Sequence, residues 1–421
     1  MKKLIRTTMV LAALACCMQA TAIDVKLKKD RAVVDGITYA INPKKQSAVV
    51  VKGQQPYVGD LAIPEKIVVD SVTLYVEEIS SGAFKDSPAL TSIEIPNCIT
   101  KIGASAFEGC TSLTEITLPS RITELPAELF ENCSSLTTIN LAEGTTKLSS
   151  ALFRGCKSLV EFEIPGGVTE IPNACFAECS ELRHVTLPAG IKKVGNDAFE
   201  NCTSLENIEF PTGVTSLGDD LFRGCTSLRE FYFPAGTSVV ASDMFRGCAE
   251  LKRVELSNSI KKIEHDAFNG CASLDSIELS NSISSVASSA FEGCASLLKV
   301  KLPNSIKEIS ASTFKGCSSL IEINLPNSLV KINSNAFSNC SSLPAITLPV
   351  SLKQIESDAF ENCNNLKDIY VNSAIPIKIS SDSFSKATQK ECIVHVKKGS
   401  ATNYNLDKQW SKFLNIINME Q

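Results

Sequence analysis

The chain has 421 residues, of which 44% are hydrophobic and 21% charged, and its formal net charge at pH 7 is −5. This composition excludes a mainly disordered chain, because it supplies enough apolar side chains to build a core. The slightly acidic balance gives no general attraction to nucleic acid or to anionic membranes, so we expect neither as a partner.

Residues 1–22 have the pattern of a secretory signal. Three basic residues lie within the first six positions, an apolar run covers residues 9–18, and the sequence Ala-Thr-Ala ends at Ala22. We expect cleavage after Ala22 and export. The apolar run is too short for a membrane anchor, since a spanning helix needs about 20 residues. A lipoprotein acylated at Cys16 or Cys17 is the alternative. We expect no transmembrane segment elsewhere.

Residues 23–80 lack the repeat that dominates the rest of the chain. They contain short apolar runs with an alternating pattern, such as residues 48–51 and 67–69, separated by turn residues. This pattern predicts strands and hairpins that form a β-rich N-terminal cap over the open edge of the first repeat. Residues 61–64 resemble the end of a repeat strand, which indicates a degenerate first copy inside the cap.

A phenylalanine returns every 23 residues, at positions Phe84, Phe107, Phe130, Phe153, Phe176, Phe199, Phe222, Phe245, Phe268, Phe291, Phe314, Phe337 and Phe360. Each copy is expected to form one coil of a solenoid, because an inserted residue would move every later side chain out of its column. Three residues past the phenylalanine stands cysteine in twelve consecutive copies, and six residues past it stands leucine in all thirteen. We therefore predict an array of 23-residue repeats over residues 81–371.

The copy that starts at Phe291 shows the expected course of one coil. Val300 and Leu302 alternate with outward lysines, as in a strand, and Pro303 ends the strand because proline has no N–H group. From Ile309 the apolar spacing approaches the helical period and predicts a short helical turn. The expected fold class is α/β: a curved solenoid with a parallel sheet on one face, and short helical turns and extended segments on the other.

The pattern L-x-x-I-x-L-P-x-x-I-x-x-I-x-x-x-A-F-x-x-C resembles the repeat of the BspA-like leucine-rich repeat proteins. It is intact over residues 113–136, except that Leu129 replaces the alanine, and it covers residues 90–366 densely. The resemblance implies a leucine-rich-repeat solenoid that is secreted or carried on the cell surface, with outer-membrane association as one form. It also implies adhesion, for some members, to host proteins or to other cells.

Residues 372–421 are expected to form a C-terminal cap of mixed structure. After residue 369 the register slips by one position to Phe384, and the only tryptophan, Trp410, lies close to Phe413. We expect Trp410 to anchor this cap rather than to bind a ligand.

Seventeen cysteines in an exported chain would ordinarily suggest disulfides. Stacked coils place successive cysteine Cα atoms about 4.8 Å apart, which a disulfide permits. Parallel side chains, however, keep the Cβ atoms at nearly that same spacing, whereas a disulfide prefers about 3.8 Å. We therefore favour free, buried thiols that pack as small hydrophobic groups, and we predict no zinc or other metal site.

The sequence contains no recognisable catalytic motif. Its histidines, His184, His265 and His395, fall far apart in the repeat scheme, and the motifs GxSxG, HExxH and the phosphate-binding loop are absent. We expect no enzyme, no catalytic residue and no cofactor, because a solenoid without inserted loops offers no closed cleft.

The outward strand positions, eight and ten residues past each phenylalanine, are the candidate functional surface. From the fifth to the eighth copy these positions are acidic with one aromatic residue between them. The predicted partner-binding residues are His184, Glu209, Glu230, Tyr232, Arg253 and Glu255. The alternative interpretation is that they are ordinary solvated strand residues. Two functions therefore stand side by side: binding of a protein partner, host extracellular or bacterial, in the manner of an adhesin, or a structural role in the cell envelope.

Overall fold

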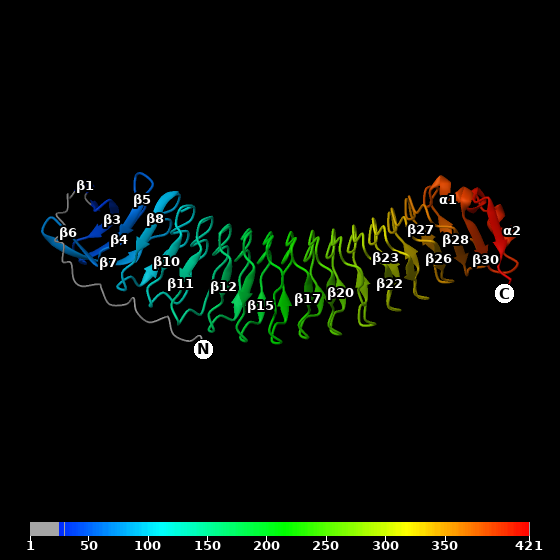
Figure 1. The fold of residues 1–421 in the computed structure, drawn as a ribbon, viewed down its shortest axis with the longest axis horizontal. Helices are drawn as coiled ribbons and strands as arrows, with labels where there is room; N and C mark the ends of the chain where they lie inside the picture. The colour runs from blue at the N-terminus through cyan, green and yellow to red at the C-terminus, as the bar shows by residue number, and fades with distance from the viewer. Residues whose placement is uncertain (1–24, 29, 421) are drawn as a thin grey trace, which may run out of the picture.

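The computed structural model describes residues 25–28 and 30–420, and the predicted signal with Cys16 and Cys17 lies outside them. The chain forms an elongated row of stacked coils that follow one another in sequence order, and both ends of the row bend to the same side (Figure 1). The predicted curved solenoid is therefore confirmed.

A mixed sheet begins the described chain and passes directly into the stacked coils; its hairpin pairs are antiparallel, whereas β4 and β7 pair in parallel. Its strand order is β1-β2-β3-β4-β7-β6, and β7 also pairs in parallel with β9, a strand of the first regular coil. A separate parallel pair joins β5, which contains residues 61 and 62, to β8. The bounds are β1 (Val25–Lys28), β2 (Arg31–Val34), β3 (Ile37–Asn42), β4 (Ser47–Val50), β5 (Val58–Ala62), β6 (Lys66–Val69), β7 (Val72–Ile79), β8 (Ala89–Glu94) and β9 (Lys101–Ile102).

The coils carry two rows of short parallel strands. The first strand row, predicted from the alternation before each proline, runs through β8, β10 (Glu115–Thr117), β11 (Thr138–Asn140), β12 (Glu161–Glu163), β14 (His184–Thr186), β17 (Glu230–Tyr232), β19 (Arg253–Glu255), β22 (Lys299–Lys301), β24 (Glu322–Asn324), β26 (Ala345–Leu348) and β28 (Asp368–Val371). Paired residues are 23 positions apart, as in Glu230 with Arg253. The register therefore follows the sequence repeat.

The second strand row follows the proline turn and consists of two-residue strands. It runs through β9, β13 (Glu170–Ile171), β15 (Lys193–Val194), β16 (Ser216–Leu217), β18 (Val239–Val240), β20 (Lys262–Ile263), β21 (Ser285–Val286), β23 (Glu308–Ile309), β25 (Lys331–Ile332), β27 (Gln354–Ile355) and β29 (Lys378–Ile379). The sequence analysis expected only extended segments here, because two residues are too few to show a strand period.

The expected helical turns around each phenylalanine do not form in residues 30–385, so the α/β prediction is wrong there. Ser289 and Gly293 flank Phe291 with positive φ angles of 56° and 74°, which a helix cannot include. The N–H of Phe291 instead donates to the carbonyl of Thr313 in the next coil, at 2.9 Å. Backbone hydrogen bonds thus join successive coils at this position, and only short turns bond within a coil, so the fold is a strand-rich leucine-rich-repeat solenoid.

The phenylalanines form one continuous stack through the core. Adjacent rings, from Phe84 to Phe384, lie 4.9–5.8 Å apart between centroids. All of them are buried, including Phe384, whose one-residue slip is absorbed before its ring. The separate coils therefore share a single core, and each coil depends on its neighbours for burial.

The cysteine column lies beside the phenylalanine stack, and all fifteen described cysteines are free thiols, as predicted. The sequence did not reveal their hydrogen bonds. Each of the twelve column thiols donates to the carbonyl of the phenylalanine in the preceding coil, at 3.0–3.3 Å. Eleven of these carbonyls, all except that of Phe84, also accept the N–H of their own coil's cysteine, so the thiol satisfies the second lone pair.

The C-terminal end adds the described helices and two more strands. They are α1 (Lys386–Glu391), β30 (Ile393–Val396), α2 (Ala401–Leu406), the 3-10 helix η1 (Trp410–Lys412) and β31 (Asn415–Asn418). β30 and β31 extend the first strand row in parallel. Trp410 is fully buried and its Nε1 donates to the carbonyl of Ile377 at 2.7 Å, so it joins η1 to the residue before β29.

Candidate partner-binding face

The outward side chains of the first strand row form one continuous surface, here called the strand face. In β12, β14, β17 and β19 the central residue is buried and both flanking residues are exposed. Because the register between paired strands is 23 residues, side chains of neighbouring coils stand side by side about 4.8 Å apart. Residue types that change from copy to copy at these positions therefore change the chemistry along one continuous surface.

Four of the six predicted residues form a connected group, here called the Tyr232 cluster: Glu230, Tyr232, Arg253 and Glu255. The Tyr232 hydroxyl donates to Glu230 Oε2 at 3.0 Å. The Arg253 guanidinium lies 5.4 Å from the centre of the Tyr232 ring and 3.6 Å from Glu255 Oε2. The hydrogen bond to Glu230 raises the pKa of Tyr232. These contacts hold an exposed aromatic ring in a defined orientation.

The other two predicted residues lie outside this cluster. Glu209 is exposed in the coil between β14 and β17, in a segment that forms no strand. His184 is exposed on β14, opposite Glu161 of β12. His184 belongs to a different feature of the strand face, and the six predicted residues do not form a single site.

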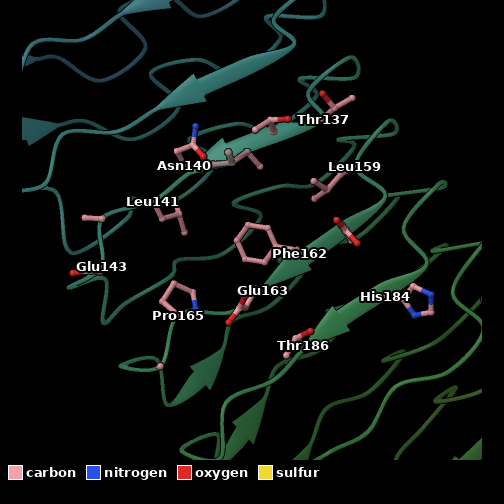
Figure 2. Close-up of a pocket in the computed structure, with 15 residues that line it drawn as sticks. Thr137, Asn140, Leu141, Glu143, Leu159, Phe162, Glu163, Pro165, His184 and Thr186 are labelled. Atoms are coloured by element: carbon pink, nitrogen blue, oxygen red, sulfur yellow. The ribbon is translucent and has the colours of Figure 1, made fainter. Parts of the chain in front are cut away.

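That feature is a hollow of about 750 Å³ between β11 and β12. Residues that line it are Thr137, Thr138, Ile139, Asn140, Leu141, Ala142, Glu143, Leu159, Glu161, Phe162, Glu163, Pro165, Gly166, His184 and Thr186. Figure 2 shows the Phe162 ring in its middle, with Asn140 and Leu141 on one side and Thr186 and His184 on the other. The sequence analysis missed this hollow. Its only signal was Phe162, an aromatic residue in a column of mostly Ile and Val.

The hollow lies at an interruption of the first strand row. β10 pairs with β11 and β12 pairs with β14, but β11 and β12 do not pair, and no backbone hydrogen bond joins residues 138–141 to residues 160–164. The core is more open here as well, since Ile139 is only partly buried whereas Ile116, its equivalent one coil earlier, is fully buried.

A second hollow, of about 450 Å³, lies further along the strand face. It is lined by Ile277, Glu278, Leu279, Lys299, Val300, Lys301, Glu322 and Asn324. Here Lys299 contacts Glu322 at 2.9 Å and lowers its pKa. Charges of both signs thus neutralise one another in this hollow.

Three carboxylates outside the strand face, those of Glu108, Glu128 and Glu131, lie within 4.8 Å of one another. Each already has a partner: Lys85 contacts Glu108 at 2.6 Å, the Ser105 hydroxyl contacts Glu128 at 2.7 Å, and Arg154 lies 3.8 Å from Glu131. Burial and the neighbouring Glu108 raise the pKa of Glu131. The group is accounted for as an ion-pair network without a bound cation.

The three histidines do not meet. His184 is on the strand face, His265 is exposed just after β20, and His395 lies in the C-terminal sheet. The His395 Nε2 atom is 2.7 Å from Asp368 Oδ1, and its ring stacks on Tyr370 at 4.5 Å. That contact fixes a sheet residue in place and brings no nucleophile to the imidazole.

Comparison with known proteins decides the family. The model of the BspA type leucine rich repeat region matches residues 77–206, 192–321 and 285–401. The chain belongs to this family. No curated protein matches it, and within residues 25–28 and 30–420 no helix is long and apolar enough to cross a membrane.

Solved structures agree with the BspA-type assignment. A leucine rich cell surface protein from Faecalibacterium prausnitzii is 25% identical with a TM-score of 0.56, over 83% of this chain and 94% of that protein. A leucine-rich repeat protein from Bacteroides ovatus is 26% identical with a TM-score of 0.58, over 80% of this chain and 94% of that protein.

Proposed function

We propose that this BspA-type protein is exported to the cell surface and binds a protein partner through its strand face, in the manner of an adhesin. The observation that carries the proposal is the Tyr232 cluster. Its tyrosine is 45% exposed, yet it is held by Glu230 and Arg253, so little side-chain entropy is lost when a partner packs on it. Tyrosine and arginine are also the residue types that contribute most at protein interfaces.

Support for export comes from the sequence pattern of residues 1–22 and from the cell surface protein of F. prausnitzii, which shares the fold. The proposal includes no catalytic activity. The repeats carry no inserted loops, so reacting groups on the strand face would stay in contact with water.

A role in envelope architecture is the second candidate, and the C-terminal end favours it. Leu406, Leu414 and Ile417 are 81%, 70% and 46% exposed, and β31 is the last strand of its sheet. An open strand edge beside exposed apolar side chains is a surface on which a further protein can assemble.

The test is a pull-down of the purified chain against host extracellular proteins and against bacterial envelope fractions. The strand-face variant is Tyr232→Ala/Glu230→Lys. The matched control is Tyr75→Ala/Glu77→Lys, which removes an exposed tyrosine and a glutamate two residues apart on β7. We expect a host protein to be retained by wild type and by the control variant and lost by the strand-face variant. Capture that the strand-face variant leaves unchanged contradicts the proposal, and capture of envelope components alone supports the second candidate.

A further inference from the structure

The hollow between β11 and β12 differs from the second hollow because, in the part of the chain that the structure describes, its carboxylates have no ion-pair partners. Glu143, Glu161 and Glu163 line it, and His184 is the only other ionisable residue in its wall. Within residues 30–420 these three carboxylates form no ion pair and no side-chain hydrogen bond. In the second hollow, by contrast, Lys299 neutralises Glu322. The first hollow therefore presents uncompensated negative charge.

The surroundings extend this field. Over the six coils from residue 161 to residue 278, the outward strand positions carry six glutamates and one arginine. Carboxylates so close together repel one another, and a cation placed among them relieves the repulsion. A positively charged group is therefore the complement of this part of the strand face.

The apolar floor of the hollow favours an arginine side chain over a metal ion as the bound cation. Phe162 is only 8% exposed, and it and Leu159 line the hollow as its apolar floor. Apolar surface below and carboxylates above suit the long side chain of arginine, whose stem packs on the ring while its planar guanidinium contacts two carboxylate oxygens. A bare metal ion would leave the apolar floor unused.

The interrupted sheet adds backbone groups to the same place. Residues of a parallel strand direct their N–H and C=O groups to alternate edges. The Asn140 carbonyl accepts from Leu118 in the preceding coil, so the neighbouring residue Ile139 directs its groups toward β12. Since β11 and β12 do not pair, these groups have no backbone partner in β12, and Ile139 lines the hollow.

We propose that the hollow binds an extended basic segment of a protein partner, anchored by an arginine between Glu161 and Glu163 and resting on Phe162. The inference rests on the proposed function, since it identifies the chemistry of the partner. It adds a second contact site, three coils from Tyr232. Of the six predicted residues, only His184 lines this site.

The experiment measures the fluorescence anisotropy of a labelled ten-residue peptide of alternating Arg and Thr, added to the purified chain. The matching Lys-Thr and Glu-Thr peptides serve as comparison probes. Two variants change the hollow: Glu161→Gln/Glu163→Gln removes charge, and Thr138→Trp fills the space without changing charge. Their controls are Glu170→Gln/Glu308→Gln, on exposed positions of the second strand row, and Thr347→Trp, on an exposed position of β26.

We expect the Arg-Thr peptide to bind more tightly than the Lys-Thr peptide, and the Glu-Thr peptide not to bind. Each lost exposed charge pair is worth about 0.2–1 kcal/mol, so the loss of two pairs in the double Gln variant should weaken binding about 2- to 30-fold. Thr138→Trp should weaken it comparably, and neither control should change it.

Equal losses in the hollow variants and in the controls overturn the inference, because they indicate general attraction to an acidic protein. Absence of Arg-Thr binding to wild type also overturns it. Partner capture that still depends on Tyr232 would then leave the proposed function standing. Partner capture that no strand-face variant affects refutes the proposed function separately.

Discussion

The thiol of Cys294 donates a hydrogen bond to the main-chain carbonyl of Phe268, one coil earlier, at 3.2 Å. The same relationship recurs along the cysteine column, so each thiol joins two coils and also fills core volume. Serine would present a more polar hydroxyl to an apolar core, and alanine would present no donor, which explains why a small, weakly polar donor suits this position.

Cys294→Ala should lower the free energy of unfolding by about 1–2 kcal/mol, because it removes a buried hydrogen bond and leaves a small cavity. Cys294→Val should also destabilise the chain, since extra methyl groups overfill a packed core. Urea denaturation followed by circular dichroism measures both. Thr347→Ala, on an exposed strand position, is the control. An unchanged midpoint for Cys294→Ala would refute a structural role for the thiol.

The stability of the chain should decrease at alkaline pH. Burial raises the pKa of Cys110 from 9.0 to about 12, so the folded state keeps a proton that the unfolded state releases. The stabilisation is complete below pH 9.0 and is lost as the pH rises toward 12. At pH 9.5 this one thiol accounts for about 0.8 kcal/mol of lost stability. Urea midpoints at pH 7.5 and 9.5 should therefore differ less in Cys110→Ala than in wild type.

Gly293→Ala should destabilise the chain by about 1–2 kcal/mol. Gly293 has a φ of +74°, and an added Cβ would lie 3.5 Å from the Cα of Gly270 in the preceding coil. Gly166→Ala is the matched control, because its Cβ would meet nothing within 4 Å. Thermal unfolding of both variants makes the comparison. Equal effects would show that the left-handed turn is not required.

Trp410→Phe should loosen the C-terminal cap without unfolding the array. It removes the donor to the Ile377 carbonyl and leaves a buried acceptor unpaired, which costs about 1–3 kcal/mol. Hydrogen exchange should become faster in β30 and β31 and stay unchanged in β10, which lies at the other end of the solenoid. Faster exchange throughout the chain would mean that the coils unfold as one cooperative unit.

The repeat predicted the buried columns because identical spacing forces identical environments. The burial of Phe291, Cys294 and Val300 followed from the 23-residue period alone. The same period predicted that the four members of the Tyr232 cluster lie side by side on the strand face. The left-handed residue two positions before each phenylalanine could not be predicted, since serine, aspartate and alanine all adopt a positive φ there. At these positions the backbone N–H donates to the next coil, as Ser289 does to the Ala311 carbonyl at 3.0 Å, and no one residue type marks them.

The hollow could not be predicted for a related reason. Phe162 occupies a column that the repeat assigns to the core, and it is indeed buried. β11 and β12 do not pair beside it, whereas β17 and β19 pair beside Phe231 in the same column, so the residue type alone does not predict the hollow. The same holds for the Tyr232 cluster, whose members were predicted but whose internal contacts were not.

The uninterrupted stack from Phe84 to Phe384 also bears on how such a chain changes in length. Every junction from Phe84 to Phe360 has the same aromatic, thiol and carbonyl contacts, so deletion or duplication of one 23-residue unit there would recreate a junction that the molecule already contains. Each added unit would lengthen the solenoid by about 4.8 Å. A lineage could therefore adjust the length of this protein without redesigning its interior.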